Sequence, residues 1–210
     1  MDGSRARQTR TRRPVVQPRD ALCFVPLAAG DVDTLRSFFA ELGDEGRRLR
    51  FCQGTPVVPE SVIRQLAAVD GHDTVAWLVL DGEHGVGEAR FVRDRIDRRI
   101  AEVAFAVVPS HRRRGIARRL LETLSVLAAS RGIRTFTYSV LAENRAAPEL
   151  LRSFGGRHAL VDGLVEGSAS VPLTRTPDVD RLAVLTRDSA ATLLPLVDRS
   201  GARALAGAAA

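Results

Sequence analysis

The stretch AEVAFAVVPSHRRRGIARRLL, residues 101–121, decides the fold of this chain. Its first part, Ala101–Val108, is a short apolar run closed by Pro109, which predicts an interior strand. From Ile116 onward, apolar side chains recur at helical spacing with arginines on the other side, which predicts an amphipathic helix. The stretch therefore indicates a buried strand, a tight basic turn and the beginning of a helix.

The turn between these two elements, residues 112–117, has the form R-x-x-G-x-A. The first amides of a helix have no acceptor within the helix, and the helix dipole places partial positive charge there. Because Gly115 and Ala117 carry little or no side chain, a phosphate can approach the backbone closely. Such a terminus can hold a pyrophosphate, and nearby arginines add charge. The alternative is a solvated basic turn between two core elements.

This segment resembles the acyl-CoA-binding motif of the GNAT acetyltransferase superfamily, Q/R-x-x-G-x-G/A between a strand and a helix. The resemblance implies acetyl-CoA as co-substrate, with its pantetheine paired to the strand backbone and its pyrophosphate on the helix amides. Asn144, in LAENRAAPELL (141–151), matches a family asparagine that follows the fifth strand, although it also suits a helix cap. The residues expected to bind the cofactor are Ala106, Val107, Val108, Arg112, Arg113, Arg114, Gly115, Ile116, Ala117, Arg118 and Asn144.

The rest of the chain predicts an α+β protein with one crossover helix. Asp31 suits a helix cap, and Gly43 suits the end of that helix. The order of elements is that of the GNAT fold, a mixed and mostly antiparallel twisted sheet flanked by helices. The other expected elements are strands at 21–26, 74–80, 86–92, 135–140, 158–161 and 169–173, and helices or turns at 47–51, 59–68 and 144–154.

Length and composition indicate one globular domain with two tails. The chain has 210 residues, of which 45% are hydrophobic and 27% are charged. Residues 20–174 are expected to form the GNAT domain. Residues 1–19, with six arginines, are expected to be a disordered basic arm, and residues 175–210 a tail that is partly helical or disordered.

Charge, hydropathy and cysteine usage narrow the classes of partner that the sequence predicts. The net charge is +6 and every basic residue is arginine, but the basic arm lacks interleaved aromatics, so nucleic-acid binding is not expected. No apolar run is long enough to span a membrane and no signal sequence is present, which favours a cytoplasmic protein with no membrane partner. Cys23 and Cys52 have no metal-site spacing, so no metal is expected.

Acetyl transfer to an amine needs the neutral amine, so a general base is expected. Glu102 lies in the central strand, where desolvation can raise the pKa of a carboxylate and make it a usable base. The alternative is a cross-strand salt bridge. Glu88, in the preceding strand, is expected to form a structural ion pair.

The segment RIDRRIAEVAF (95–105) is similar to the catalytic domain of Pat-type bacterial protein lysine acetyltransferases, in which the glutamate of A-E-V-A-F is the base. The resemblance implies Glu102 as base and a protein lysine as acceptor. The chain departs from the pattern at Leu151, where many members have a tyrosine that protonates the leaving thiolate, and Tyr138 is not a substitute. A small amine remains the alternative acceptor. The alternative functions are a non-catalytic acyl-CoA sensor and, less expected, a nucleic-acid-associated protein that uses the arginine arm.

Overall fold

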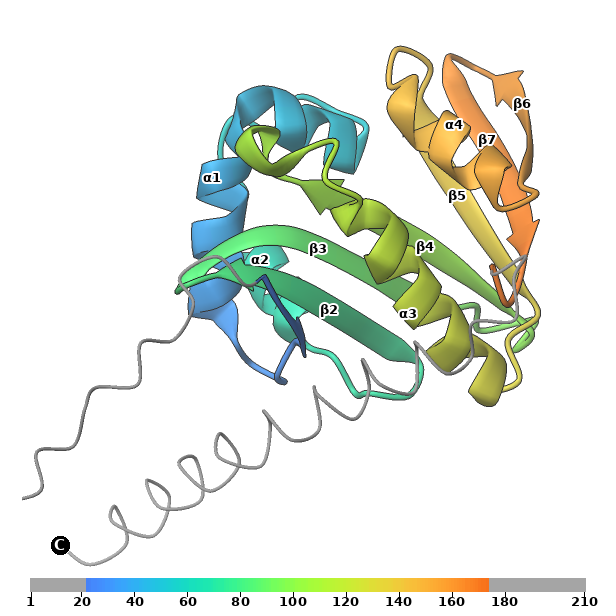
Figure 1. Ribbon diagram of the computed structural model, residues 1–210, viewed down its shortest axis with the longest axis horizontal. Helices are drawn as coiled ribbons and strands as arrows, with labels where there is room; N and C mark the ends of the chain where they lie inside the picture. The colour runs from blue at the N-terminus through green and yellow to red at the C-terminus, as the bar shows by residue number, and fades with distance from the viewer. Residues whose placement is uncertain (1–21, 174–210) are drawn as a thin grey trace, which may run out of the picture.

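The computed structural model describes residues 22–173, which fold around one seven-stranded mixed sheet (Figure 1). The expected basic arm (1–19) and C-terminal tail (175–210) lie outside the described residues. The elements follow in the order that the sequence predicts. They are β1 (Cys23–Pro26), α1 (Val32–Phe51), α2 (Glu60–Ala67), β2 (Thr74–Asp81), β3 (His84–Arg93), β4 (Ile100–Val107), α3 (Ile116–Ser130), β5 (Thr135–Leu141), α4 (Ala146–Ser153), β6 (Arg157–Val161) and β7 (Leu164–Ser170).

The strand order in the sheet is β1-β2-β3-β4-β5-β7-β6. All neighbouring pairs are antiparallel except β4 and β5, which run parallel with α3 as their crossover. The predicted mixed, mostly antiparallel sheet with flanking helices is therefore confirmed.

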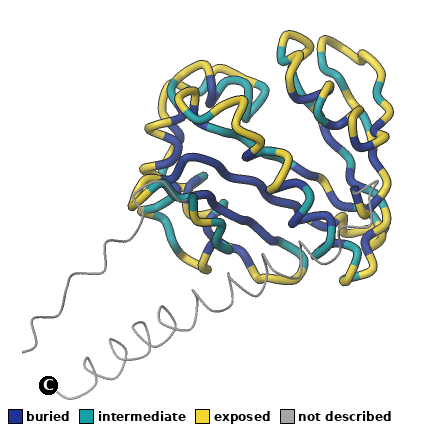
Figure 2. The backbone as a smooth tube through the Cα atoms, in the orientation of Figure 1, coloured by how far each residue is buried: buried dark blue, intermediate teal, exposed yellow. Residues whose placement is uncertain are grey.

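Helices cover both faces of the β2–β4 region (Figure 1), and buried residues concentrate along these strands (Figure 2). On one face α3 packs directly on β3, because a Cβ atom at Gly87 would come within 2.8 Å of Cγ2 of Ile116. On the other face Arg90 of β3 donates a hydrogen bond to the carbonyl of Leu66 in α2 at 2.8 Å. This second face also carries α1, whose Phe38 approaches Gly85 of β3.

Two helices owe their limits to residues that the sequence makes recognisable. Asp31 caps α1 by accepting a hydrogen bond from the Thr34 amide at 3.1 Å. Gly43, with φ +70° and ψ 171°, breaks α1 where the sequence predicts an end, and the second half continues to Phe51. Gly132, with φ +81°, follows the last residues of α3.

The end of the sheet differs from the prediction. The last strand runs over Leu164–Ser170, not over residues 169–173, and pairs with β6 through a two-residue turn. That turn is Asp162-Gly163, and both residues have positive φ. Asp-Gly is a strong hairpin signal, and it places the strand directly after the turn.

The feature that positions the site is the short contact between β4 and β5. The two strands are paired only over Ile100–Glu102 and Thr135–Thr137. Beyond Glu102 they separate, and the β5–β7–β6 unit stands away from β1–β4 (Figure 1). The sheet thus opens on the side toward which β4 runs, just before α3 begins.

Candidate active site

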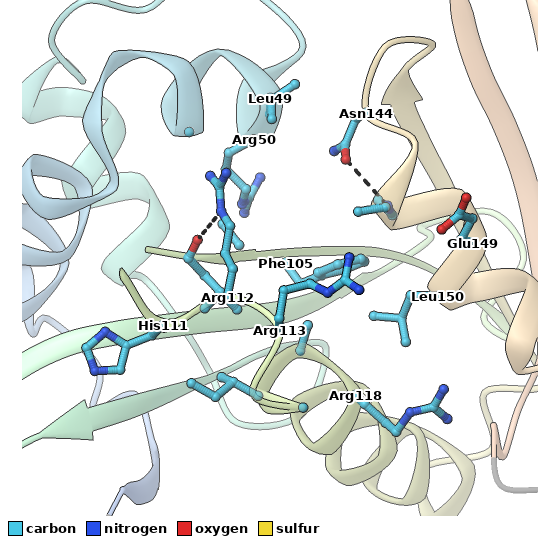
Figure 3. Close-up of a pocket in the computed structure, with 18 of the residues that line it drawn as sticks. Leu49, Arg50, Phe105, His111, Arg112, Arg113, Arg118, Asn144, Glu149 and Leu150 are labelled. Atoms are coloured by element: carbon cyan, nitrogen blue, oxygen red, sulfur yellow. Dashed lines mark hydrogen bonds between the residues drawn. The ribbon is translucent and has the colours of Figure 1, made fainter. Parts of the chain in front are cut away.

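A cavity of about 500 Å³ occupies this opening (Figure 3). Its walls come from the second half of α1, the end of β4, the beginning of α3, and α4 with its preceding loop. Of the residues expected to bind a cofactor, those that line it are Ala106, Val107, Arg112, Arg113, Gly115, Ile116, Ala117, Arg118 and Asn144. The fold therefore brings together residues that are up to 38 positions apart, from 106 to 144.

The N-terminus of α3 supplies free backbone donors to this cavity. Gly115 is the N-cap residue with φ +78° and ψ 3°, and no side chain caps the helix. The amides of the first turn, at Ile116, Ala117 and Arg118, therefore have no partner within the helix. Apart from Gly115 itself and its two neighbours in the chain, no atom of the described residues lies within 4 Å of the position that a Cβ would take there. This set of donors and the open space beside it fit an anionic group such as a pyrophosphate.

The end of β4 offers one backbone edge to the cavity. The amide of Val108 donates to the carbonyl of Val86 in β3 at 3.0 Å, so it is already used within the sheet. Because backbone groups alternate in direction along a strand, those of Phe105 and Val107 face the opening. The Val107 carbonyl accepts a hydrogen bond from Nε of Arg112 at 3.2 Å, drawn as a dashed line in Figure 3.

The structure places two of the expected cofactor residues outside the lining of this cavity. Val108 is 1% exposed, and its backbone is committed to β3, so it presents neither side chain nor amide to the opening. Arg114 is exposed but does not line the cavity. The sequence alone did not distinguish Val108 and Arg114 from neighbouring residues that do line the cavity, because all of them lie close to the same turn.

Arg118, in the first turn of α3, and Asn144, in the loop before α4, each contact α4. Arg118 donates to the Ser153 hydroxyl of α4 at 2.9 Å, and its guanidinium lies 4.8 Å from the centre of the Phe154 ring. The Asn144 side-chain oxygen accepts from the Ala147 amide at 3.4 Å, which is the capping role that its sequence position also allowed.

Glu102 lies where β4 and β5 separate, but it is exposed, so the burial that the sequence predicts for it is wrong. Its cross-strand partner Val92, on the same face of the sheet, is also exposed at 45%, so the helices leave this part of the face uncovered. Glu102 does not line the first cavity. It lines a second, more open groove of about 680 Å³ over β5, β6 and β7, with Thr137, Ser139, Glu166 and Ser168 among its neighbours.

Glu88 is the buried carboxylate of this region. It forms an ion pair with arginine, as the sequence predicts. Glu88 is 0% exposed and accepts from Nε of Arg90 at 2.5 Å. Arg50 of α1 approaches its other oxygen at 3.5 Å. Burial lowers the pKa of Arg50, against the opposing attraction of Glu88, and Glu102 is near enough to add to that attraction.

The structure also places Leu151, which stands where many family members have the proton-donating tyrosine, and Tyr138, which is not expected to replace it. Leu151 is fully buried and does not line the cavity, whereas its neighbour Leu150 does. Tyr138 lies on β5 near His158, and burial raises the pKa of its hydroxyl. Neither residue lines the first cavity.

Residues that sequence reasoning did not assign to the site include Leu49, Arg50, Phe105, Glu149 and Leu150. Phe105 was foreseeable, because it lies between two assigned positions on the same strand. Arg50 was visible only as one arginine of an arginine-rich helix. Its placement depends on the packing of α1 against β3 and β4, which local sequence does not encode.

Two further features concern metals and membranes. Within residues 22–173, no three His, Cys, Asp or Glu side chains come together in a way that could hold a metal ion, and the expectation of no metal stays a prediction. In the same residues, no helix combines the length and apolar character needed to cross a bilayer.

Comparisons with a family model, with a relative of known name and with solved structures agree with one another. Residues 39–155 match the family model described as the acetyltransferase (GNAT) family. Over 150 residues the chain is 31% identical to acetyltransferase Pat of Mycolicibacterium smegmatis, which covers 70% of this chain and 45% of that protein. This chain thus spans less than half the length of that relative.

Solved structures agree with this match. The GNAT domain of S. lividans PAT superposes with a TM-score of 0.66 at 27% identity, over 70% of this chain and 89% of that domain. A phosphinothricin acetyltransferase from Sinorhizobium meliloti, solved in complex with acetyl-CoA, superposes with a TM-score of 0.59 at 16% identity, over 71% and 88%. The expected sheet and its helices are therefore those of the fold that these proteins share.

Proposed function

The chain belongs to the acetyltransferase (GNAT) family, and from this membership we propose that it transfers the acetyl group of acetyl-CoA to a primary amine, with a protein lysine as acceptor. The predicted class of enzyme, an N-acetyltransferase, follows from the family. The observation that carries the proposal is the opening between β4 and β5. The uncapped N-terminus of α3 and the carboxylate of Glu102 lie on different sides of this opening.

The donor is held along the first cavity. Acetyl-CoA supplies an acyl group activated as a thioester. The amides of Ile116, Ala117 and Arg118 and the side chain of Arg113 meet its pyrophosphate. The backbone of Val107 meets its pantetheine, which requires Arg112 to release the Val107 carbonyl. Amides on this edge of β4 also stabilise the negative charge that develops on the thioester oxygen.

Glu102 acts as the general base, directly or through water. Because it is exposed, its carboxylate is solvated, and it attracts a cationic amine before accepting a proton from it. Its position at the last paired residue of β4 puts it between the donor cavity and the open groove. The location of Glu102 therefore supports its role as base, whereas the desolvation expected from its place in the sequence does not contribute.

The open groove supports a protein lysine as acceptor. Most of its lining side chains are polar and come from β4, β5, β6 and β7. Its two carboxylates, Glu102 and Glu166, complement a cationic side chain, and they outnumber the one arginine of the described lining, Arg157. Its outer edge includes the exposed Val161. A lysine has a long, flexible side chain that can reach the strand junction from a surface contact. A small amine is the alternative acceptor, and a cytoplasmic location is part of the proposal.

The test is turnover of acetyl-CoA with a panel of lysine-containing proteins and small amines, measured by release of free thiol. Glu102→Gln is expected to lower kcat by about 100-fold or more, since general-base catalysis contributes on that order. Its affinity for CoA, measured by calorimetry, is expected to change less than about 3-fold because Glu102 does not line the donor cavity.

Glu83→Gln is the matched control, because Glu83 is an exposed carboxylate in the turn between β2 and β3. The chain contains no lysine, so acetyl-lysine found after the reaction belongs to the acceptor. Undiminished turnover in Glu102→Gln would remove the base assignment. Absence of CoA binding in the wild type would remove the proposal as a whole.

The second candidate function is an acyl-CoA sensor without turnover. It is favoured by Leu151, which leaves no proton donor at the position where many family members have tyrosine. Tight CoA binding without thiol release on any acceptor would establish it.

A further inference from the structure

Arg50, near the end of α1, is a buried cation that is only partly satisfied by the protein. Its side chain is 8% exposed, yet its Nε has no hydrogen-bond partner among residues 22–173. It forms an ion pair with Oε2 of Glu88 at 3.5 Å, and the same carboxylate also pairs with Arg90. One buried carboxylate therefore faces two guanidinium groups, which leaves the capacity to bind a further anion.

Arg47, one turn earlier in the same helix, shows what a structural arginine looks like here. Its side chain is 9% exposed, and its guanidinium donates to the carbonyls of Thr55 at 3.0 Å, Phe39 at 2.8 Å and Pro56 at 2.5 Å. It also pairs with Asp44. The helix can therefore bury an arginine with all of its groups used, and Arg50 is not used in that way.

The location of Arg50 connects it with the donor. It lines the first cavity, at the end away from α4, and it does not line the groove proposed for the acceptor. Arg112 points into the same end of the cavity, as Figure 3 shows. The one carboxylate in the described lining, Glu149, stands across the cavity on α4. The lining of this end therefore carries two positive charges, while the nearest carboxylate, Glu88, is shared between Arg50 and Arg90. Burial lowers the pKa of Arg50, and a further anion beside it would favour its charged form.

We propose that Arg50 forms a carboxylate-binding subsite for the acyl group of the donor, so that the protein transfers acyl groups with a terminal carboxylate, such as succinyl, from their CoA thioesters. This inference rests on the proposed function, because it uses the same cavity and base. A guanidinium binds a carboxylate with charge-assisted hydrogen bonds that a neutral acyl group cannot make.

The chemistry is the same acyl transfer with a longer acyl group. The acceptor nitrogen attacks the thioester carbonyl, a C–N bond forms and the C–S bond breaks. Glu102 takes the amine proton, and CoA leaves as the thiolate, which is protonated by solvent. The acyl carboxylate stays ionised on Arg50 throughout, and no oxidant or further reactant is needed. Acetyl is too short to carry such a group, so acetyl transfer does not use the subsite.

The test compares two thioesters of the same shape and different charge. Succinyl-CoA and 4-methylpentanoyl-CoA have acyl chains with the same number and branching of heavy atoms, and only the first ends in a carboxylate. Without acceptor, calorimetry on the wild type is expected to give at least about 10-fold tighter binding of succinyl-CoA. Equal affinities in the wild type would overturn the proposal, and this comparison needs no variant.

Variants then assign the preference to Arg50. In Arg50→Gln the two thioesters are expected to bind within about 2-fold of each other, whereas Arg50→Lys keeps part of the preference because the charge remains. CoA and acetyl-CoA are expected to bind Arg50→Gln within about 3-fold of the wild type. Arg64→Gln, at an exposed arginine of α2, is the control and keeps the full preference. A preference that survives Arg50→Gln would overturn the assignment.

Turnover separates this inference from the proposed function. Succinyl transfer lost in Arg50→Gln while acetyl transfer continues would support the subsite. A preference for carboxylate-bearing acceptors that disappears in Arg50→Gln would place the subsite on the acceptor side and overturn the donor assignment. No turnover with either thioester, but a binding preference that depends on Arg50, would support the subsite and count against the proposed transferase activity.

Discussion

Glu88, in the middle of β3, and Glu102, near the beginning of β4, lie on neighbouring strands, and the fold gives them opposite environments. Glu88 is packed under α1 between two arginines and is fully buried. Glu102 lies at the last pair that joins β4 to β5 and is exposed. A buried carboxylate with a hydrogen-bonded arginine is suited to structure, and a solvated one at an opening is suited to proton transfer.

At the residue scale, the structure also predicts the reactivity of Cys52. Burial raises the pKa of its thiol. Its Sγ faces the Ser139 carbonyl at 3.6 Å, whereas Cys23 is exposed on β1. A raised pKa means less thiolate at pH 8, so Cys52 is expected to react with iodoacetamide at least about 5-fold more slowly than Cys23. Its rate is expected to rise with pH until the pH passes its raised pKa.

Peptide mapping by mass spectrometry between pH 7 and pH 10 measures both rates. The same reaction in denaturant is the control, because unfolding removes the difference in burial between the two cysteines. If Cys52 reacts as fast as Cys23 in the folded protein, the burial of its thiol is not as described.

At the scale of the element, the N-terminus of α3 carries the donor site through its backbone. Its N-cap residue, Gly115, has a left-handed conformation, and Gly71, in the loop between α2 and β2, has nearly the same φ of +70°. At both glycines, apart from the glycine itself and its two neighbours in the chain, the space that a Cβ would occupy has no atom of the described residues within 4 Å. The two glycines therefore share the same backbone demand, but only one lies beside the cavity.

Gly115→Ala and Gly71→Ala are expected to lower the free energy of unfolding by similar amounts, about 1–2 kcal/mol each, because alanine is strained at positive φ. Gly115→Ala is also expected to weaken CoA binding by about 5-fold or more, because relief of that strain turns the first amides of α3 away from the ligand. Chemical denaturation and calorimetry measure the two effects. Equal CoA affinity in both variants would contradict a role for this helix terminus.

At the scale of the whole molecule, the sheet consists of two parts joined by a short contact. Pairing between β4 and β5 covers only Ile100–Glu102 and Thr135–Thr137. The donor cavity has walls on both sides of the opening, from α1, β4 and α3 on one side and from α4 with its preceding loop on the other. A ligand in this cavity therefore contacts both parts and stabilises their native arrangement.

Acetyl-CoA is accordingly expected to raise the melting temperature. At a concentration 100 times its Kd it adds about 2.7 kcal/mol to the free energy of unfolding, which is about 5–10 °C for a protein of this size. Calorimetric melting with and without the ligand measures the shift. The Gly115→Ala variant should show a smaller shift at the same concentration, and an unchanged melting temperature in the wild type would contradict binding in this cavity.

The extent of the catalytic domain is also a property of the whole molecule. Within the described residues, the walls of the donor cavity run from Leu42 to Ser153 along the chain, and those of the acceptor groove from Glu102 to Ser168. We therefore propose residues 20–174 as the catalytic domain. The expected basic arm and C-terminal tail lie outside the described residues and remain predictions.

The sequence alone determined the order of the elements, the fold family and the anion-binding beginning of α3. These features are local: a strand, a turn with Gly115 and an amphipathic helix are encoded by residues that follow one another in the chain. Asp31 at the beginning of α1 was predictable for the same reason. The Asp162-Gly163 turn was equally local, and the wrong limits of the last strand came from overlooking it.

Only the tertiary structure decided which charged side chains are buried and which face the opening. Glu102 is exposed because the helices leave its part of the sheet face uncovered, as the exposed Val92 beside it shows, and Arg50 reaches the donor cavity because α1 packs on the second face of the sheet. Both outcomes depend on how helices pack on the sheet, and Arg50 lies 38 residues before its ion-pair partner Glu88. The environment of a charge is set by everything packed around it, so neither the exposure of Glu102 nor the partly satisfied guanidinium of Arg50 could be derived from the neighbouring sequence.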